Sequence, residues 1–180
     1  MTQLEIYNAA LGMIGHDRTL SSTSGTETEA VRCNTYYAAA RRAMFCLYDW
    51  KWLSTEASIT AGATLVNGMY AHTAITGLLR VLSVTDAAGM PLVYDMVGSI
   101  IRTDARTVVA RYIADNETTA SWPDLITDAV VAELAARICV PMTGNVQRSS
   151  ELHAQALGKL AEAAQQSGDP PAQGSRKQEE

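Results

Sequence analysis

The chain has 180 residues and a mass of 19.3 kDa, which is enough for one domain with a sizeable core. It has no run of about 18 apolar residues that could span a bilayer, and its first residues lack the basic and apolar regions of a secretory signal, so we expect neither membrane insertion nor export. The net charge is -5 and the 14 basic residues are scattered, which disfavours tight binding of nucleic acid.

The first predicted helix covers residues 3–14. Thr2 and Glu5 have the spacing of a capping box, in which each satisfies a backbone N–H at the start of a helix. Gly15 is well placed to end the helix. A polar loop rich in Ser and Thr follows over residues 16–25.

The second predicted helix covers residues 27–48 and begins at a second capping pattern, Thr26 with Glu29. Apolar residues form one stripe along it, so that stripe should be buried. We expect Glu29, Arg32 and Arg41 to face water on the opposite side.

The composition changes over residues 59–114, where runs of β-branched residues alternate with turn signals. Loops this short favour antiparallel neighbours, because a parallel return needs a crossover of about a dozen residues. We therefore expect a small antiparallel meander between the second and third helices. The predicted strands are residues 78–85, 92–96, 99–103 and 107–113.

Two more helices are predicted, over residues 123–139 and 147–165. Pro141 and Gly144 should end the first of them. The fold class expected is α+β but mainly α, a bundle of about four helices with the β meander inserted. We expect one domain over residues 1–166.

The C-terminal residues 167–180 are rich in Gly, Pro and charged residues. Such a segment cannot bury enough apolar surface to offset the entropy lost on ordering. We expect it to be disordered unless it is bound to a partner.

The residue types that carry catalysis or bind metals occur without a recognisable motif. The three histidines lack the HxxxH or HExxH spacing of a zinc site, and the cysteines form no CxxC pair, so we interpret them as free thiols in the core. No phosphate-binding glycine loop is present. We expect no enzyme activity, no metal and no cofactor. The histidines are His16, His72 and His153, and the cysteines are Cys33, Cys46 and Cys139.

Several charged and aromatic side chains are instead candidates for a protein interface, since Arg and Trp are enriched at such contacts. Arg41 and Arg42 have two open interpretations: pairing with acidic groups across an interface, or a solvated helix face. The full set of candidate interface residues is Arg41, Arg42, Trp50, Trp52, Glu151, Lys159, Arg176 and Lys177.

Two motifs stand in the first third of the chain: residues 4–15, with an Asn-Ala-Ala-Leu core before Ile-Gly, and residues 33–52, with a characteristic spacing of Cys, Tyr, Arg and Trp. Five shorter features follow them along the chain: Leu-Arg-Val-Leu at 79–82, Ile-Arg-Thr-Asp at 101–104, Arg-Tyr-Ile at 111–113, Trp-Pro at 122–123 and Leu-Ala-Ala-Arg-Ile at 134–138. Over residues 3–160 the chain resembles the head-to-tail adaptor, or tail tubular protein A, family of short-tailed bacteriophages.

The resemblance implies a virion protein that forms a dodecameric ring beneath the portal and continues the DNA channel toward the tail for genome ejection. The partners implied are the portal protein, a tail nozzle or tail tube protein, and further copies of the chain, with DNA passing through the lumen without specific binding. The expected location is the virion connector, after assembly in the host cytoplasm. Two alternatives remain open, a small helical binding or regulatory module without a virion role and an enzyme with an unrecognised site.

Overall fold

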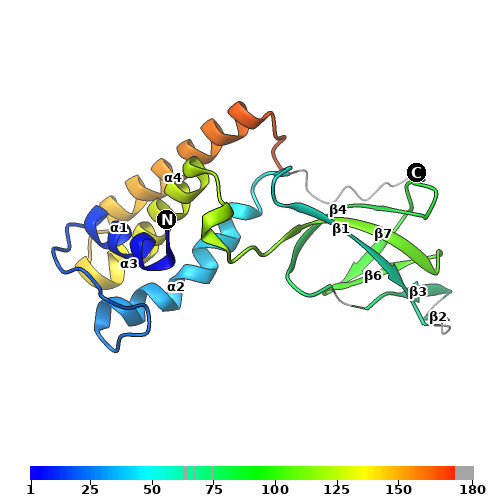
Figure 1. Cartoon of the computed structure of the whole chain (residues 1–180), viewed down its shortest axis with the longest axis horizontal. Coiled ribbons are helices and arrows are strands. Elements are labelled where there is room, and N and C mark those ends of the chain that lie inside the picture. The colour runs from blue at the N-terminus through cyan, green and yellow to red at the C-terminus, as the bar shows by residue number, and fades with distance from the viewer. Residues whose placement is uncertain (63–64, 67, 74, 173–180) are drawn as a thin grey trace. The chain divides into compact units, whose positions relative to one another are not determined.

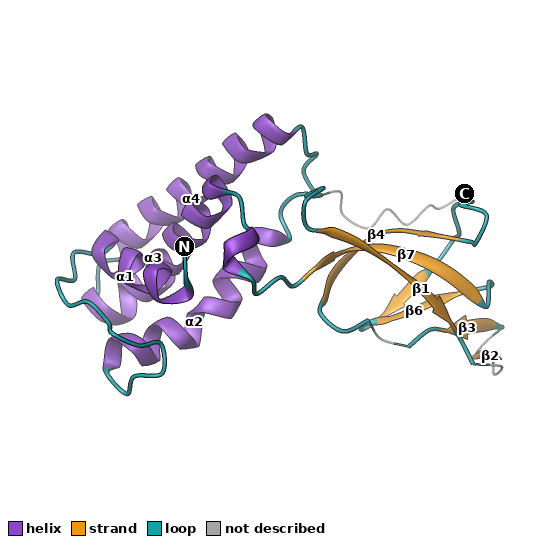
Figure 2. Ribbon diagram, viewed as in Figure 1, coloured by secondary structure: helices purple, strands orange, loops and turns teal. Residues whose placement is uncertain are grey.

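The computed structural model describes residues 1–62, 65–66, 68–73 and 75–172. The chain divides into two compact units. One is helical and contains residues Met1–Leu47 and Glu117–Asp169; the other is β-rich and contains the described residues of 48–116 together with residues 170–172. Figure 2 shows the helices and the strands segregated in this way. The single domain expected over residues 1–166 thus spans parts of both units.

The helical unit is built around α3, which packs against α1, α2 and α4. Most of the residues of α3 are buried, as expected of a helix that is apolar on nearly all sides. A short 3-10 helix, Thr119–Ser121, precedes α3. The bounds are α1 Gln3–Met13, α2 Thr28–Phe45, α3 Asp124–Thr143 and α4 Val146–Ser167.

The helix starts confirm one capping prediction and correct another. The Glu5 N–H donates to Thr2 Oγ1 at 3.3 Å and the Thr2 N–H donates to Glu5 Oε2 at 2.7 Å, so the first capping box is present. The second is wrong, because Glu27 is the N-cap of α2 and makes no side-chain cap bond. Glu29 is buried instead, with its carboxylate 3.6 Å from His16 and 3.7 Å from Arg18.

The end of α3 also differs from the prediction. Pro141 lies inside the helix, which continues to Thr143. Because Pro141 is in the last turn, its missing N–H removes only one of the final backbone bonds. Gly144 ends the helix as predicted, with a left-handed φ of 70° that glycine adopts at little steric cost.

The β unit overturns the predicted fold class, since it contains two antiparallel sheets instead of one small meander in a mainly helical bundle. The strand orders are β1-β7-β4 and β2-β3-β6-β5. In a meander consecutive strands are neighbours, whereas here β7 lies between β1 and β4. The bounds are β1 Ser54–Thr60, β2 Leu65–Val66, β3 Met69–Ala71, β4 Leu78–Thr85, β5 Asp95–Val97, β6 Ile100–Thr103 and β7 Thr107–Ala114.

Both sheets contribute to the core of the β unit. Val84 on β4 and Val108 on β7 come from the first sheet and Ile101 on β6 from the second, and all three are buried in one cluster. The second sheet ends in a two-residue hairpin at Gly98, where Val97 pairs with Ile100. The predicted strand 92–96 is therefore replaced by β5, which begins three residues later.

The beginning of the predicted disordered tail is attached to the β unit. The Asp49 N–H donates to the Pro170 carbonyl at 3.0 Å, and Tyr48 and Pro171 form an isolated antiparallel bridge. Residues 173–180, with the candidate interface residues Arg176 and Lys177, lie outside the described residues.

Candidate interaction surfaces

Arg41, one of the candidate interface residues, is buried, with only 2% of its side chain exposed. Its guanidinium donates to Glu117 Oε1 at 2.8 Å and lies 5.5 Å from the centre of the Tyr37 ring. The expectation that Arg41 faces water is wrong, because a partner 76 positions away satisfies the charge inside the unit. Arg41 ties α2 to the segment that leads into α3.

The two tryptophans that follow α2 belong to the β unit. Trp50 is 1% exposed, and its ring centre lies 5.0 Å from that of Tyr48 in a tilted arrangement. Trp52 is half-buried. In the single chain Trp50 is therefore a core residue, and a side chain so fully covered offers little area to a partner.

Three other candidates lie at the surface of the helical unit. Arg42 on α2 and Glu151 on α4 are exposed. Lys159 on α4 is partly covered, and its Nζ donates to Asp128 Oδ2 at 2.7 Å, which links α4 to α3. Arg42 and Glu151 thus lie at the surface on two different helices.

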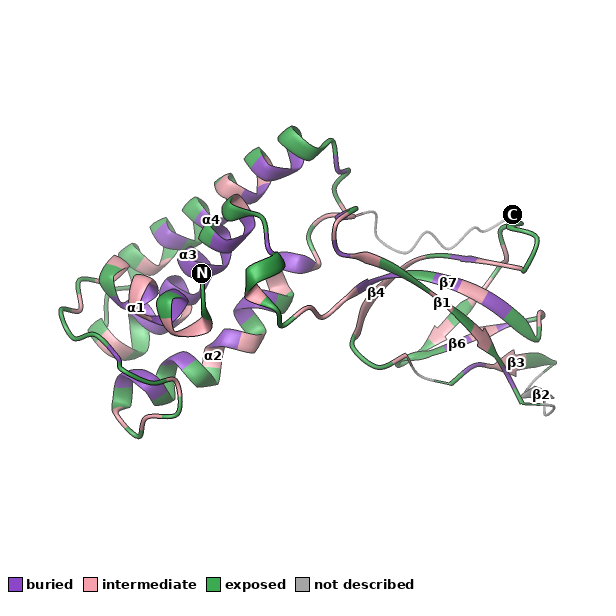
Figure 3. Cartoon of the chain, in the orientation of Figure 1, coloured by how far each residue is buried: buried purple, intermediate pink, exposed green. Residues whose placement is uncertain are grey.

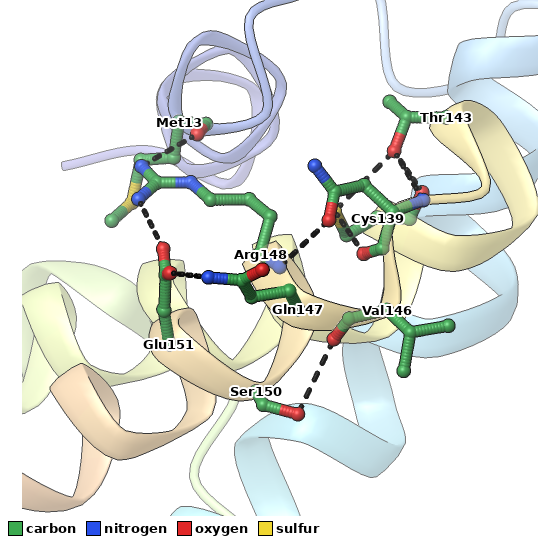
Figure 4. Close-up of polar contacts among 9 residues, drawn as sticks. Met13, Cys139, Thr143, Val146, Gln147, Arg148, Ser150 and Glu151 are labelled. Carbon is green, nitrogen blue, oxygen red and sulfur yellow. Dashed lines mark hydrogen bonds and ion pairs between the residues drawn. The ribbon is translucent and has the colours of Figure 1, made fainter.

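The N-terminal turn of α4 is tied to the end of α1 through Arg148 (Figure 4). Its guanidinium donates to the Met13 carbonyl at 3.1 Å and to Glu151 Oε2 at 3.3 Å. Gln147 donates to the other oxygen of the same carboxylate at 3.2 Å. These contacts hold the first turn of α4, and with it Glu151, in a defined position.

Glu133, which the sequence analysis did not single out, makes a second link between α3 and α4. It is 3% exposed, and its two carboxylate oxygens lie 2.7 Å from Arg137 Nε and 2.6 Å from His153 Nδ1. Both partners reach solvent, at 34% and 53% exposure of their side chains. The sequence carries a signal for this link, because Glu133 stands within the apolar segment 129–139 and a carboxylate buried with that segment needs hydrogen-bonding or charged partners.

The groups considered for catalysis or metal binding are dispersed. Burial raises the pKa of the Cys33 thiol to about 11, which opposes formation of a reactive thiolate. His72 is buried, with Nε2 3.1 Å from the Ala105 carbonyl. Within the described ranges, no three His, Cys, Asp or Glu side chains are grouped so that they could hold a metal ion.

The interpretation of the cysteines as core residues is confirmed for two of the three. Cys33 and Cys139 are buried, whereas Cys46 is half-buried, and all three are free. The Cys139 Sγ lies 3.4 Å from the Asn145 carbonyl and 3.5 Å from Thr143 Oγ1, at the turn between α3 and α4. Cys139 and Thr143 are labelled in Figure 4.

In the part of the chain that the structure describes, none of the helices has the length and apolar character needed to cross a bilayer. A comparison with protein-family models and with curated protein sequences finds no match for this chain.

Proposed function

We propose that this chain is a structural head-to-tail adaptor of a short-tailed bacteriophage, which assembles as a ring between the portal and the tail and continues the DNA channel. The observation that carries the proposal is the ordered set of motifs over residues 3–160 that resembles this family. The second candidate function is a small helical binding module without a virion role, and a negative result in the portal-binding experiment described below would favour it.

The way in which the two main motifs meet supports the proposal. Tyr7, from the first motif, donates its hydroxyl proton to Asn34 Oδ1 of the second at 2.8 Å. Its ring also packs edge-on against Tyr37 of the second motif, with ring centres 5.4 Å apart. The helical parts of the two main motifs therefore pack against each other through α1 and α2, as expected if they specify a common helical unit.

The charge of the chain suits a conduit for DNA. Each phosphate that a protein neutralises adds to affinity, so a strongly basic wall would retard DNA in transit. A net charge of -5 agrees with a lumen that is neutral or acidic. The partners proposed are the portal protein on one side of the ring and a tail nozzle or tail tube protein on the other.

The test is to mix the purified chain with portal rings of a short-tailed phage and to image the product by electron microscopy. A ring of this protein stacked on the portal, and the presence of the chain in purified particles by mass spectrometry, are the expected results. A chain that ignores the portal and is missing from particles would refute the proposal and favour the binding module.

A further inference from the structure

β1 is an edge of the first sheet, which can be followed in Figure 1 by its labels β1, β7 and β4. Among the described residues β1 pairs with β7 and with no other strand. Its register is regular from Ser54, opposite Ile113, to Thr60, opposite Thr107. All of its residues are exposed or half-buried, green and pink in Figure 3. An exposed edge of this kind presents backbone N–H and C=O groups with which another strand can pair.

The backbone groups that face the open edge belong to the even-numbered residues of β1. The Ala61 N–H donates to the Arg106 carbonyl at 2.8 Å, and the Ala114 N–H donates to the Leu53 carbonyl at 3.4 Å. Because the direction of these groups alternates along a strand, the odd-numbered residues of β1 point theirs at β7 and the even-numbered residues point theirs away from it. The four residues that face the edge are Ser54, Glu56, Ser58 and Thr60.

Most of these edge groups lack a partner within the chain. The Ser54 N–H is taken, since it donates to the Trp50 carbonyl at 2.9 Å. For the N–H groups of Glu56, Ser58 and Thr60 the part of the chain that the structure describes provides no acceptor. Donors and acceptors repeated at every second residue are what an added antiparallel strand requires. The edge therefore selects an extended backbone as its partner.

The opposite edge of the same sheet, β4, is protected from such pairing. Its register with β7 shifts at two places. The segment after it also folds back, so that the Leu92 N–H donates to the Val84 carbonyl at 2.9 Å. Bulges, covering segments, Lys and Pro are the devices by which proteins keep edges from pairing. β1, with the sequence Ser-Thr-Glu-Ala-Ser-Ile-Thr and a regular register, has none of them.

The edge of β1 is complementary to a second copy of itself. In an antiparallel pair centred on Ala57, Glu56 lies opposite Ser58 of the second copy. Ser54 then lies opposite Thr60 of the second copy, so each edge-facing residue meets another and no two carboxylates are directly opposite. A pair centred on Glu56 would place two carboxylates face to face, which is destabilising. A pair centred on Ser58 would leave Ser54 opposite a residue beyond the strand.

We infer that β1 of one copy pairs antiparallel with β1 of a second copy, centred on Ala57, and so joins two β units through one continuous sheet. Each pairing of Glu56 with Ser58 exchanges two hydrogen bonds, and each pairing of Ser54 with Thr60 makes one, because the Ser54 N–H is already used. The occupant is a second copy because both the row of donors and acceptors and the position of the carboxylate match β1 itself.

This contact is separate from the ring of the proposed function. It is isologous, with the same strand on both sides, and it therefore closes at two copies. It needs no portal and no further subunits. The inference concerns the free chain and does not rest on the proposed function.

Cysteine cross-linking reads the register of the contact. The two copies of Ala57 lie directly opposite at a non-hydrogen-bonded position, where Cα atoms are about 4.5 Å apart, a separation that a disulfide can span. Ala57→Cys should therefore form a disulfide-linked dimer under mild oxidation. Thr60→Cys is the matched control, because its two thiols would be about 20 Å apart along the paired strands. It should form no more linked dimer than the natural chain with its three thiols.

Two substitutions of opposite charge at one exposed position test the same register through affinity. Ser58 lies opposite Glu56 of the second copy, and this pairing occurs twice in the dimer. Ser58→Lys should tighten self-association about fivefold and Ser58→Glu should weaken it by a similar factor. In a Glu56→Gln background the difference between the two should disappear. Sedimentation velocity over a concentration series measures the dissociation constants.

Ser58→Pro tests the backbone pairing itself. Proline removes an N–H that faces away from β7, so the sheet of the single chain keeps its hydrogen bonds. The variant should keep the far-UV circular dichroism spectrum of the natural chain and lose self-association. If it fails to fold, the cysteine pair still tests the contact.

The outcomes decide the inference. A linked dimer with Ala57→Cys alone, together with opposite shifts in affinity for the two charge variants, supports it. A natural chain that stays monomeric across the concentration series overturns it. So do equal cross-linking at positions 57 and 60, equal affinities of Ser58→Lys and Ser58→Glu, or self-association that persists in a folded Ser58→Pro variant.

Discussion

Replacing Trp50 by alanine should lower the free energy of unfolding of the chain by about 4 kcal/mol. Trp50 is 1% exposed, and an aromatic side chain of this kind buries about 200 Å², which at about 25 cal/mol per Å² corresponds to roughly 5 kcal/mol as an upper value. Truncation of buried aromatic residues to alanine costs about 3 to 5 kcal/mol. The loss of the tilted contact with Tyr48 is part of that cost.

Trp50→Phe is the matched variant for this experiment. Among the described residues the indole Nε1 of Trp50 has no hydrogen-bond partner, so phenylalanine loses no bond and should cost no more than about 1.5 kcal/mol. Urea unfolding followed by far-UV circular dichroism measures both values. Sedimentation of Trp50→Phe should show unchanged association. If Trp50→Ala kept its stability to within about 1 kcal/mol and lost association, Trp50 would be an interface residue and the reasoning from burial would be wrong.

Three further predictions concern local features. Burial raises the pKa of the Cys33 thiol from 9.0 to about 11, so the folded state holds this proton more tightly than the unfolded state does. The stabilisation that results is complete below pH 9 and is lost as the pH rises from 9 to 11. The free energy of unfolding of Cys33→Ala, measured with urea, should therefore fall less steeply over that pH range than that of the natural chain. Thr2→Ala removes the cap of α1 and should cost about 1 kcal/mol in the same assay; no loss would mean that the capping box contributes nothing. Gly144→Ala places a side chain at a φ of 70° and should cost about 1 to 2 kcal/mol, and an unchanged urea midpoint would contradict that strain.

The helices were predictable because their signals are local. The capping box of α1 and the glycine after α3 act within a few residues of the chain, and the apolar stripe of Cys33, Tyr37 and Met44 repeats along a single helix. The observed bounds of α1 and α4 lie within two residues of the predicted ones. Such signals do not depend on what the helix packs against.

The sheets were predicted poorly because strand pairing is a long-range choice. β1, Ser54–Thr60, has little alternation of apolar and polar residues, and it is stabilised by pairing with β7 about 50 positions later. Nothing within its own seven residues announces that partner. The same limit applies to the candidate interface residues, since Arg41 could be nominated from sequence, whereas its pairing with Glu117, 76 positions later, could not.

By itself, the sequence determined where the four helices form, that the segment between α2 and α3 adopts strands, and that free cysteines occupy core positions at Cys33 and Cys139. Only the tertiary structure decided that the strands form two sheets, that Arg41 pairs with Glu117, and that α3 packs against both α2 and α4. The physical reason is that caps and periodicity act over one or two helical turns, whereas burial depends on contacts between residues that are far apart in the chain.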